Sequence, residues 1–211
     1  SAKTCGPWRG SPFILRMSLF SVLNGFVLRL SQVTGGHLTD DEGDCNAVST
    51  AKLDVLSDIL DTMLTEDRKL VIMARFVPEL NEIQKLLEQK QIGYASVRGG
   101  ISDRAEEIRR FQEDADCRVF VGQIAAAGLG ITLTAASTMV FYSLDYSMSN
   151  FEQAKARIHR VSQTENCLYI YLTAKHTVDT KILRALRDKA DLAKMLVDDY
   201  RNGSNPFQEG V

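Results

Sequence analysis

The 211-residue sequence has few cysteines, and their placement excludes two common kinds of site. No CxxC pair occurs, and no cluster of histidines accompanies any cysteine. Isolated thiols of this kind argue against a zinc site and against a disulfide framework, and they suit a reducing compartment. We therefore expect no metal site built from this chain's own side chains. The four cysteines are Cys5, Cys45, Cys117 and Cys167.

The sequence also lacks a long hydrophobic run and a strong charge of either sign. No stretch of about 18 apolar residues occurs, which argues against a membrane partner. The apolar residues 13–20 are interrupted by Arg16, and no small-residue cleavage site follows them. With 25 basic and 27 acidic residues the net charge is −2, so nucleic-acid binding does not follow from overall charge and requires a local cluster.

Two regions of different character follow one another along the chain. Residues 1–48 are expected to form a helical or linker segment, with a helix most favoured at 19–30 and an exposed acidic connection at 39–44. From residue 49 onward apolar residues recur at helical spacing, and Ser49 or Thr50 is suited to cap the first helix. We expect residues 49–211 to form one globular domain.

Short apolar runs alternate with helical patterns in this domain. Pro78 suits the first turn of a helix, and Ser149 with Glu152 forms a capping-box pattern for a helix that continues to about Val161. The alternation predicts an α/β fold in which a mainly parallel sheet is covered by helices on both faces. Ligands of such sheets gather beyond the carboxyl ends of the strands. The expected strands are residues 70–73, 94–97, 118–121, 139–142 and 168–172.

The segment 153–163 carries two arginines at a spacing that suggests anion binding. On a helix, Gln153, Arg157 and Arg160 would share one face, because they are spaced i, i+4 and i+7. Adjacent guanidinium groups repel each other unless an anion lies opposite them, and their planar forks suit the oxygens of a polyphosphate. Taken alone, the same pattern indicates a solvated basic surface more often than an anion site.

A run of small residues follows the third expected strand. It contains Gly128 and Gly130, which let the backbone approach a ligand closely, and the hydroxyl groups of Thr132 and Thr134. Exposed N–H groups in such a loop can donate to phosphate oxygens. An ordinary flexible turn would explain the glycines, but it explains the length of the run and the two hydroxyl groups less well.

The order of these segments resembles motifs IV, IVa, V, Va and VI of Swi/Snf-family ATPases, a branch of the superfamily II helicases. The resemblance extends from about residue 52 to 182 and depends on five ordered motifs. It implies a RecA-like three-layer fold, with residues 49–211 as the helicase C-terminal lobe and residues 1–48 leading into it. The matching segments are residues 69–76, 97–104, 127–136, 142–145 and 153–163.

The resemblance also implies roles for individual residues. Arg157 and Arg160 match the catalytic arginines that reach across a cleft between two lobes to the phosphates of ATP. Nucleotide binding is implied for Gln153, Gly128 and Gly130. Contacts to the DNA backbone are implied for Arg75, Arg98, Gly99, Thr132 and Thr134. ATP and Mg²⁺ would be held mainly by an N-terminal RecA-like lobe of the same parent chain, and the other partner would be double-stranded DNA.

Several positions depart from the family pattern. Ala74 stands where a serine is usual, Thr132 where an asparagine is common, and Ser162 where a glycine is usual. Residues 146–148 replace a Trp-Asn-Pro run. These departures suggest a chain distant from the central chromatin remodellers, of bacterial or phage origin and cytoplasmic, whereas a eukaryotic member would be nuclear.

The 211 residues contain no GxxxxGK[ST] phosphate-binding loop. We therefore expect this chain alone to be inactive, and to act as the C-terminal lobe of an ATP-dependent DNA translocase or helicase. Two alternatives remain open on the sequence. One is a lobe of another superfamily II helicase or of a restriction-enzyme motor, and the other is a non-catalytic RecA-like module that binds DNA or a protein.

Overall fold

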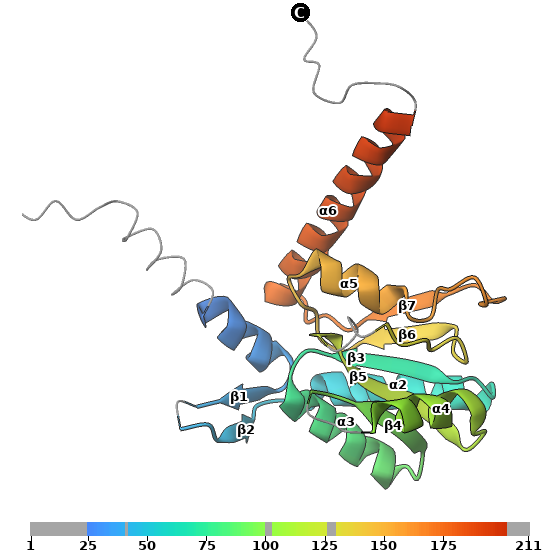
Figure 1. Cartoon of the computed structure of the whole chain (residues 1–211). Helices are drawn as coiled ribbons and strands as arrows, with labels where there is room; N and C mark the ends of the chain where they lie inside the picture. The colour runs from blue at the N-terminus through green and yellow to red at the C-terminus, as the bar shows by residue number, and fades with distance from the viewer. Residues whose placement is uncertain (1–24, 41, 100–102, 126–129, 202–211) are drawn as a thin grey trace, which may run out of the picture.

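A five-stranded parallel sheet forms the centre of the protein (Figure 1). A computed structural model describes residues 25–40, 42–99, 103–125 and 130–201. The strand order β4-β5-β3-β6-β7 requires the chain to cross over between neighbouring strands, as expected for an α/β fold. All the strands expected from the sequence are present. They are β3 (Leu70–Ala74), β4 (Gly93–Val97), β5 (Cys117–Gln123), β6 (Thr138–Phe141) and β7 (Leu168–Tyr171).

Helices cover both faces of this sheet, which gives the expected three layers. Side chains of β3 alternate between the faces, so that Leu70 and Ile72 pack on one side and Val71 and Met73 on the other. The first side is covered by α2 (Ala51–Thr65) and α3 (Val77–Gln89), and the second by α4 (Arg104–Glu113), α5 (Met148–Lys155) and α6 (Val178–Arg201). The RecA-like architecture is therefore confirmed. None of the helices in the described ranges combines the length and apolar character that crossing a bilayer requires.

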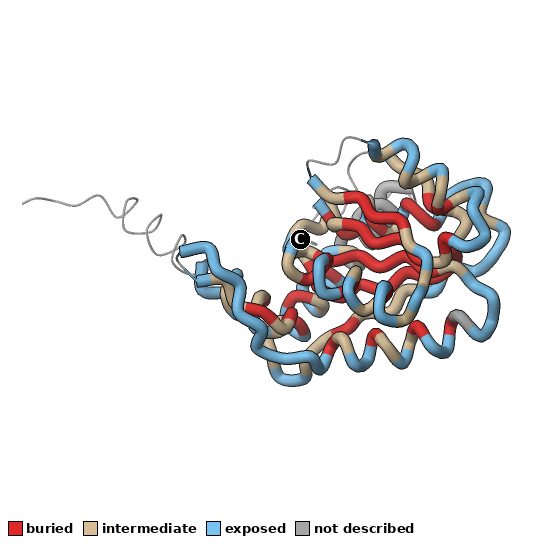
Figure 2. Tube along the Cα trace, turned by 90° about the horizontal axis from the view of Figure 1, so that it is seen from below, coloured by how far each residue is buried: buried red, intermediate tan, exposed pale blue. Residues whose placement is uncertain are grey.

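A small separate unit precedes the sheet. Residues 25–34 form a helix, and the residues after it form a two-stranded antiparallel hairpin of β1 (His37–Thr39) and β2 (Cys45–Ala47). Figure 2 shows this unit at one end of the body, largely exposed, while the buried residues concentrate in the sheet. The helix favoured at 19–30 lies partly outside the described residues, and it continues to residue 34.

The acidic segment expected to be an exposed connection is the turn of this hairpin, and Asp40 and residues 42–44 are exposed as expected. The Asp40 carboxylate accepts hydrogen bonds from the backbone N–H groups of Glu42 at 3.1 Å and Asp44 at 2.8 Å. Gly43 has a φ of 95°, a region that favours glycine. The aspartate therefore closes a turn between two strands.

The outer edge of β4 is covered by side chains of α4. The backbone N–H of Ser96 donates to Glu107 Oε2 at 2.7 Å, and Arg110 donates to the carbonyl oxygen of Tyr94. Glu107 and Arg110 also form an ion pair at 3.1 Å. Because unpaired edge groups invite pairing with another chain, this cover protects one side of the sheet.

Replacing Glu107 with alanine should lower the free energy of unfolding by about 1–3 kcal/mol, because the N–H of Ser96 would remain buried without an acceptor. Urea denaturation measures the change. Glu106→Ala is the matched control on the same helix, since its carboxylate forms an ion pair with the exposed Arg109, and it should leave the denaturation midpoint unchanged. Equal effects of the two variants would contradict a specific role for the Glu107 bond.

Candidate functional site

Several residues expected to contact DNA lie together at the carboxyl edge of the sheet. Arg75 directly follows β3, and Arg98 and Gly99 follow β4. Gln123, the last residue of β5, joins the two strand ends. Its Nε2 donates to the carbonyl oxygen of Arg75 at 3.2 Å, and its Oε1 accepts from the N–H of Gly99 at 3.5 Å. Sequence reasoning did not single out Gln123, although its position at the end of a buried strand was the available indication.

The Arg75 side chain is partly buried between two aromatic rings. Its side chain is 20% exposed, and Cζ lies 5.1 Å from the ring centroids of both Phe76 and Tyr146. Its Nε is 3.9 Å from Asp145 Oδ1, while Nη1 is buried without a hydrogen-bond partner. The guanidinium group is therefore fixed by two aromatic rings and has an unused donor. Arg98 lies nearer the solvent and donates to Asn81 Oδ1 at 2.9 Å.

The expected helix that would carry Gln153, Arg157 and Arg160 on one face is not formed. The hydroxyl oxygen of Ser147, not Ser149, caps α5 by accepting from the N–H of Asn150 at 3.2 Å, and the helix ends at Lys155. The N–H of Leu133 donates to the carbonyl oxygen of Arg157 at 2.9 Å. The N–H of Arg157 donates to the carbonyl oxygen of Ala154 at 3.0 Å, an i to i−3 bond, so Arg157 lies beyond the regular helix.

The two arginines nevertheless lie side by side. Arg157 Nη1 and Arg160 Nη2 are each 3.5 Å from the carbonyl oxygen of Ile131. Gln153 stays on α5, where its Nε2 donates to Ser149 Oγ at 2.9 Å. The structure thus brings together the two predicted catalytic residues by a different route from the one expected, and it leaves Gln153 outside their hydrogen bonds.

This pair combines a buried arginine, Arg157, with an exposed one, Arg160. Arg157 is 7% exposed, its Nε is buried without a partner, and Arg160 is exposed. Burial lowers the pKa of Arg157, and the neighbouring charge of Arg160 lowers it further. In the described part of the chain neither arginine forms an ion pair, whereas Arg109 and Arg118 each have an acidic partner. Two close cations with an unused buried donor fit the oxygens of a phosphate chain.

The loop after β5 is bonded to the arginine segment. Gly130 has a φ of 72°, which favours glycine, and a Cβ there would meet no neighbouring atom within 4 Å. Thr132 is half-buried, and Thr134 Oγ1 accepts from Gln112 Nε2 at 3.4 Å. Gln163 Nε2 donates to the carbonyl oxygen of Thr134 at 3.3 Å, which adds a second connection. Gly128 lies outside the described residues.

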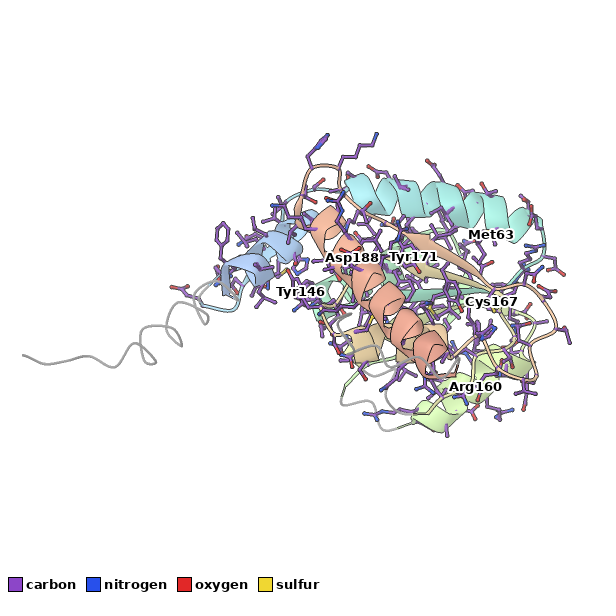
Figure 3. The ribbon with its side chains drawn as sticks, turned by 90° about the horizontal axis from the view of Figure 1, so that it is seen from above. Met63, Tyr146, Arg160, Cys167, Tyr171 and Asp188 are labelled. Atoms are coloured by element: carbon purple, nitrogen blue, oxygen red, sulfur yellow. The ribbon has the colours of Figure 1, made fainter. Side chains whose placement is uncertain are left out.

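Arg160 and Tyr146, which lies over Arg75, are well separated in Figure 3. Arg75 and the arginine pair therefore belong to two distinct clusters, whereas Thr132 and Thr134, which are also predicted to contact DNA, lie on the loop bonded to the arginine pair. The structure contains no group of three or more potential metal-ligating side chains within the ranges it describes. Neither cluster offers a complete nucleotide site, because the 211 residues contain no GxxxxGK[ST] phosphate-binding loop.

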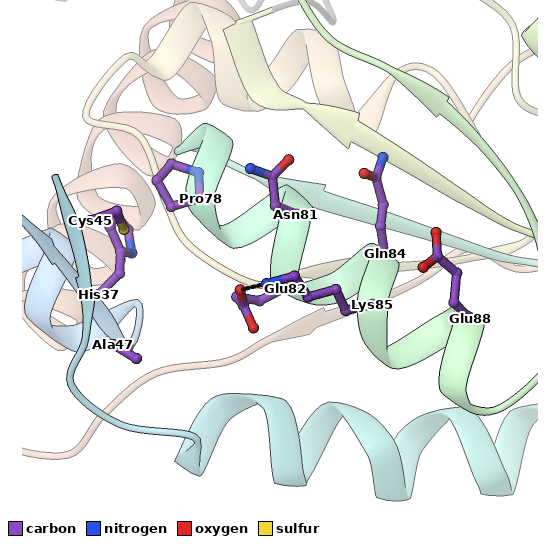
Figure 4. Close-up of a pocket in the computed structure, with 10 residues that line it drawn as sticks. His37, Cys45, Ala47, Pro78, Asn81, Glu82, Gln84, Lys85 and Glu88 are labelled. Carbon is purple, nitrogen blue, oxygen red and sulfur yellow. Dashed lines mark hydrogen bonds and ion pairs between the residues drawn. The ribbon is translucent and has the colours of Figure 1, made fainter. Parts of the chain in front are cut away.

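A cavity of about 510 Å³ lies elsewhere, between the β1–β2 hairpin and α3 (Figure 4). His37 and Cys45 line it from the hairpin, and the Glu82–Lys85 ion pair of 2.7 Å lies along its α3 side. None of the residues predicted to bind nucleotide or DNA lines this cavity. We therefore base the function on the two arginine clusters.

Comparison with known proteins identifies a family for the chain. Residues 51–162, more than half of the chain, match the family described as "Helicase conserved C-terminal domain". The chain is 30% identical over 190 residues to the human "SWI/SNF-related matrix-associated actin-dependent regulator of chromatin subfamily A containing DEAD/H box 1", an alignment covering 88% of this chain and 18% of the relative. It is also 30% identical over 148 residues to "Chromatin-remodeling ATPase INO80" of Drosophila melanogaster, covering 69% of this chain and 9% of that protein.

A solved structure described as "Crystal structure of the C-terminal part of Fun30 ATPase domain" is also similar, with a TM-score of 0.61 and 25% identity. The alignment covers 81% of this chain and 53% of that one. The chain spans less than a fifth of the length of the human and fly relatives.

The expectation of a bacterial or phage origin finds no support in these matches. The human and fly relatives carry chromatin in their names, so distance from the chromatin remodellers is not supported either. The departures at Ala74, Thr132 and Ser162 affect single side chains. The sheet and its covering helices depend on many other positions, so these three residues are a poor guide to the nearest relatives.

Proposed function

Because the chain belongs to the helicase conserved C-terminal domain family, we propose that it forms the second RecA-like lobe of an ATP-driven translocase on double-stranded DNA. The observation that carries this proposal is the adjacent pair of Arg157 and Arg160, which have no acidic partner among the described residues. Residues 49–211 form the lobe in this proposal, and residues 1–48 lead into it. The names of the relatives favour a nuclear protein that acts on chromatin.

In the proposed mechanism a first lobe of the same parent chain holds most of ATP and Mg²⁺. Closure of the two lobes brings Arg157 and Arg160 to the γ-phosphate, where they stabilise the negative charge that develops as the phosphoryl group is transferred. The backbone of Gly130 and the amide of Gln153 supply further polar groups near the nucleotide, and nucleotide binding is also predicted for Gly128, which lies outside the described residues. The fold holds the buried, unpaired Nε of Arg157 in place as a hydrogen-bond donor before a ligand binds.

In this proposal, residues at the carboxyl edge of the sheet and on the loop after β5 bind the DNA backbone. Arg75, Arg98 and Gly99 at the carboxyl edge, with Thr132 and Thr134 on the loop after β5, offer donors to phosphate oxygens. Such contacts carry no base readout, which suits a motor that moves over any sequence. Each cycle of closing and opening would shift these contacts relative to those of the first lobe and move the duplex.

The 211-residue chain alone should show no appreciable ATP turnover, with or without duplex DNA, because it lacks the GxxxxGK[ST] loop. The same lobe joined to a first lobe that contains this loop should hydrolyse ATP and be stimulated by duplex DNA. Steady-state phosphate release measures both. Turnover by the isolated chain, or a joined protein that ignores DNA, would refute the proposal.

Two competing functions give different results in the joined protein. A strand-separating helicase would release a labelled strand from a forked duplex, whereas a translocase would displace a bound triplex-forming strand without separating the duplex. A non-catalytic RecA-like module would hydrolyse no ATP with any first lobe. The match to the helicase conserved C-terminal domain family favours a catalytic lobe over this last alternative, and the ATPase measurement on the joined protein separates the two.

A further inference from the structure

Glu79 is a buried carboxylate that holds the ends of two strands. It lies in the first turn of α3 and is 2% exposed. Its Oε2 accepts hydrogen bonds from the backbone N–H groups of Arg75 at 3.2 Å and Phe76 at 3.1 Å, and from the hydroxyl group of Ser143. Ser143 Oγ in turn accepts from the N–H of Arg75 at 2.8 Å. One carboxylate oxygen therefore fixes the main chain at Arg75.

The other oxygen of Glu79 faces the N-terminal unit. Oε1 is buried without a hydrogen-bond partner, and a Cβ on Gly35 would lie 2.0 Å from it. The carbonyl oxygen of Gly35 accepts from the hydroxyl group of Tyr142 at 3.3 Å. Only glycine leaves room for the turn to rest against the carboxylate, so the position of this turn and that of Glu79 depend on each other.

Both rings that enclose the Arg75 guanidinium also contact the N-terminal unit. The Phe76 ring meets the His37 ring edge-on, with centroids 5.2 Å apart. The Tyr146 hydroxyl oxygen is 3.5 Å from Ser31 Oγ. The main chain of Arg75, through Glu79, and its side chain, through Phe76 and Tyr146, are thus all in contact with residues 31–37.

The N-terminal unit is attached to the body by a separate buried polar contact. Thr34 Oγ1 donates to Asp179 Oδ1 at 2.7 Å, and Asp179 Oδ2 pairs with Lys52 at 2.7 Å. This contact lies outside the group around Arg75, so it can be weakened without changing any residue that touches the arginine.

We propose that docking of residues 31–37 sets the position of Arg75, so that the affinity of this lobe for the DNA backbone depends on whether the N-terminal unit is docked. The inference rests on the proposed function, in which Arg75 contacts DNA. Glu79, Phe76 and Tyr146 are positioning residues that transmit the docked state. A change in how residues 25–48 are held would lower this affinity without any change in the arginine itself.

The test measures binding of the full 211-residue chain to a fluorescein-labelled DNA duplex by anisotropy, over a series of salt concentrations. Gly35→Ala places a methyl group against Glu79 and should weaken binding roughly tenfold at low salt, and reduce the slope of log K against log salt by about one, as Arg75→Ala does. Gly25→Ala is the matched control, since a Cβ there meets nothing within 4 Å, and it should bind as the unchanged chain does.

Thr34→Val is a second variant that tests the coupling if Gly35→Ala fails to fold. It removes the bond to Asp179 while keeping the shape of the side chain, and it should weaken binding in the same direction. Hydrogen exchange should show faster exchange in residues 25–48 with the protection of the sheet unchanged. The double variant Gly35→Ala with Arg75→Ala should bind no more weakly than Arg75→Ala alone, because the two changes act on one contact.

The outcomes separate the inference from the function on which it rests. If Arg75→Ala and Arg98→Ala both weaken binding while Gly35→Ala and Thr34→Val do not, the coupling is wrong and the DNA contact stands. Additive losses in the double variant would also overturn the coupling. If Arg75→Ala and Arg98→Ala bind DNA as the unchanged chain does, the proposed DNA contact itself fails.

Discussion

Arg157→Met should abolish ATP hydrolysis by the two-lobe protein and leave the folded lobe at least as stable as before. Arginines that reach a transferring phosphoryl group contribute on the order of 10³–10⁵ in rate, so kcat should fall by about that factor. Arg157 is buried, lies beside Arg160 and has an unpaired Nε, and a buried charge without a partner is destabilising. Replacing it with an apolar side chain of similar length therefore removes an unfavourable charge.

The measurements are steady-state phosphate release and thermal unfolding of each variant. Lys155→Met is the matched control, since Lys155 lies two residues away and pairs with Glu152 at 3.0 Å, and it should leave kcat unchanged. Arg160→Ala should reduce kcat to a similar extent, and the double variant should be little worse than either single one. A normal kcat with a raised KM for ATP would indicate binding alone, and a large drop in melting temperature would indicate a structural role.

The stability of the chain should fall as the pH rises from about 5 to 8, and Glu79 should account for a large part of this change. Burial raises the pKa of Glu79 from 4.5 to about 7, against the opposing effects of Ser143, the backbone N–H groups of Phe76 and Arg75, and the charge of Lys52. A raised pKa in the folded state means that the contribution is fully present below pH 4.5 and is lost as the pH rises through 7. At about 1.4 kcal/mol per unit, the loss is on the order of 3 kcal/mol.

Glu79→Gln should remove this dependence, because the amide stays neutral and keeps one acceptor oxygen for Arg75, Phe76 and Ser143. The variant should match the unchanged chain near pH 5 and exceed its stability near pH 8, as measured by urea denaturation at each pH. Glu82→Gln, an exposed carboxylate on the same helix that pairs with Lys85, should keep the original pH profile. A difference between Glu79→Gln and the unchanged chain that stays constant with pH would contradict a protonating Glu79.

The strands were predictable because each is a short apolar run bounded by polar residues. All five residues of β3 are buried, and a strand covered on both faces needs this continuous apolar character. Helix starts were predictable where one residue type suffices, as with Pro78 in the first turn of α3. These features depend on neighbouring residues, which a sequence displays directly.

The end of α5 was not predictable from the local sequence, because residues 153–163 contain no proline or glycine that would stop a helix. Beyond that end the carbonyl oxygen of Arg157 accepts a hydrogen bond from Leu133, a contact that only the folded chain shows. The packing of Tyr146 on Arg75 was not predictable for a similar reason, since Tyr146 lies far along the chain, beyond β6. The prediction that the two arginines lie side by side is confirmed, but the continuous helix on which it was based is not formed.

The bonds between the loop after β5 and the arginine segment have a mechanical consequence. Leu133 and Thr134 on the loop are each bonded to the segment that runs from Arg157 to Gln163, so the two cannot slide past each other without breaking several hydrogen bonds. If a nucleotide displaced the two arginines, Thr132 and Thr134 would be displaced by nearly the same amount. In the proposed mechanism this part of the lobe would then move as a rigid body. The conformational change of each ATPase cycle would have to occur outside it.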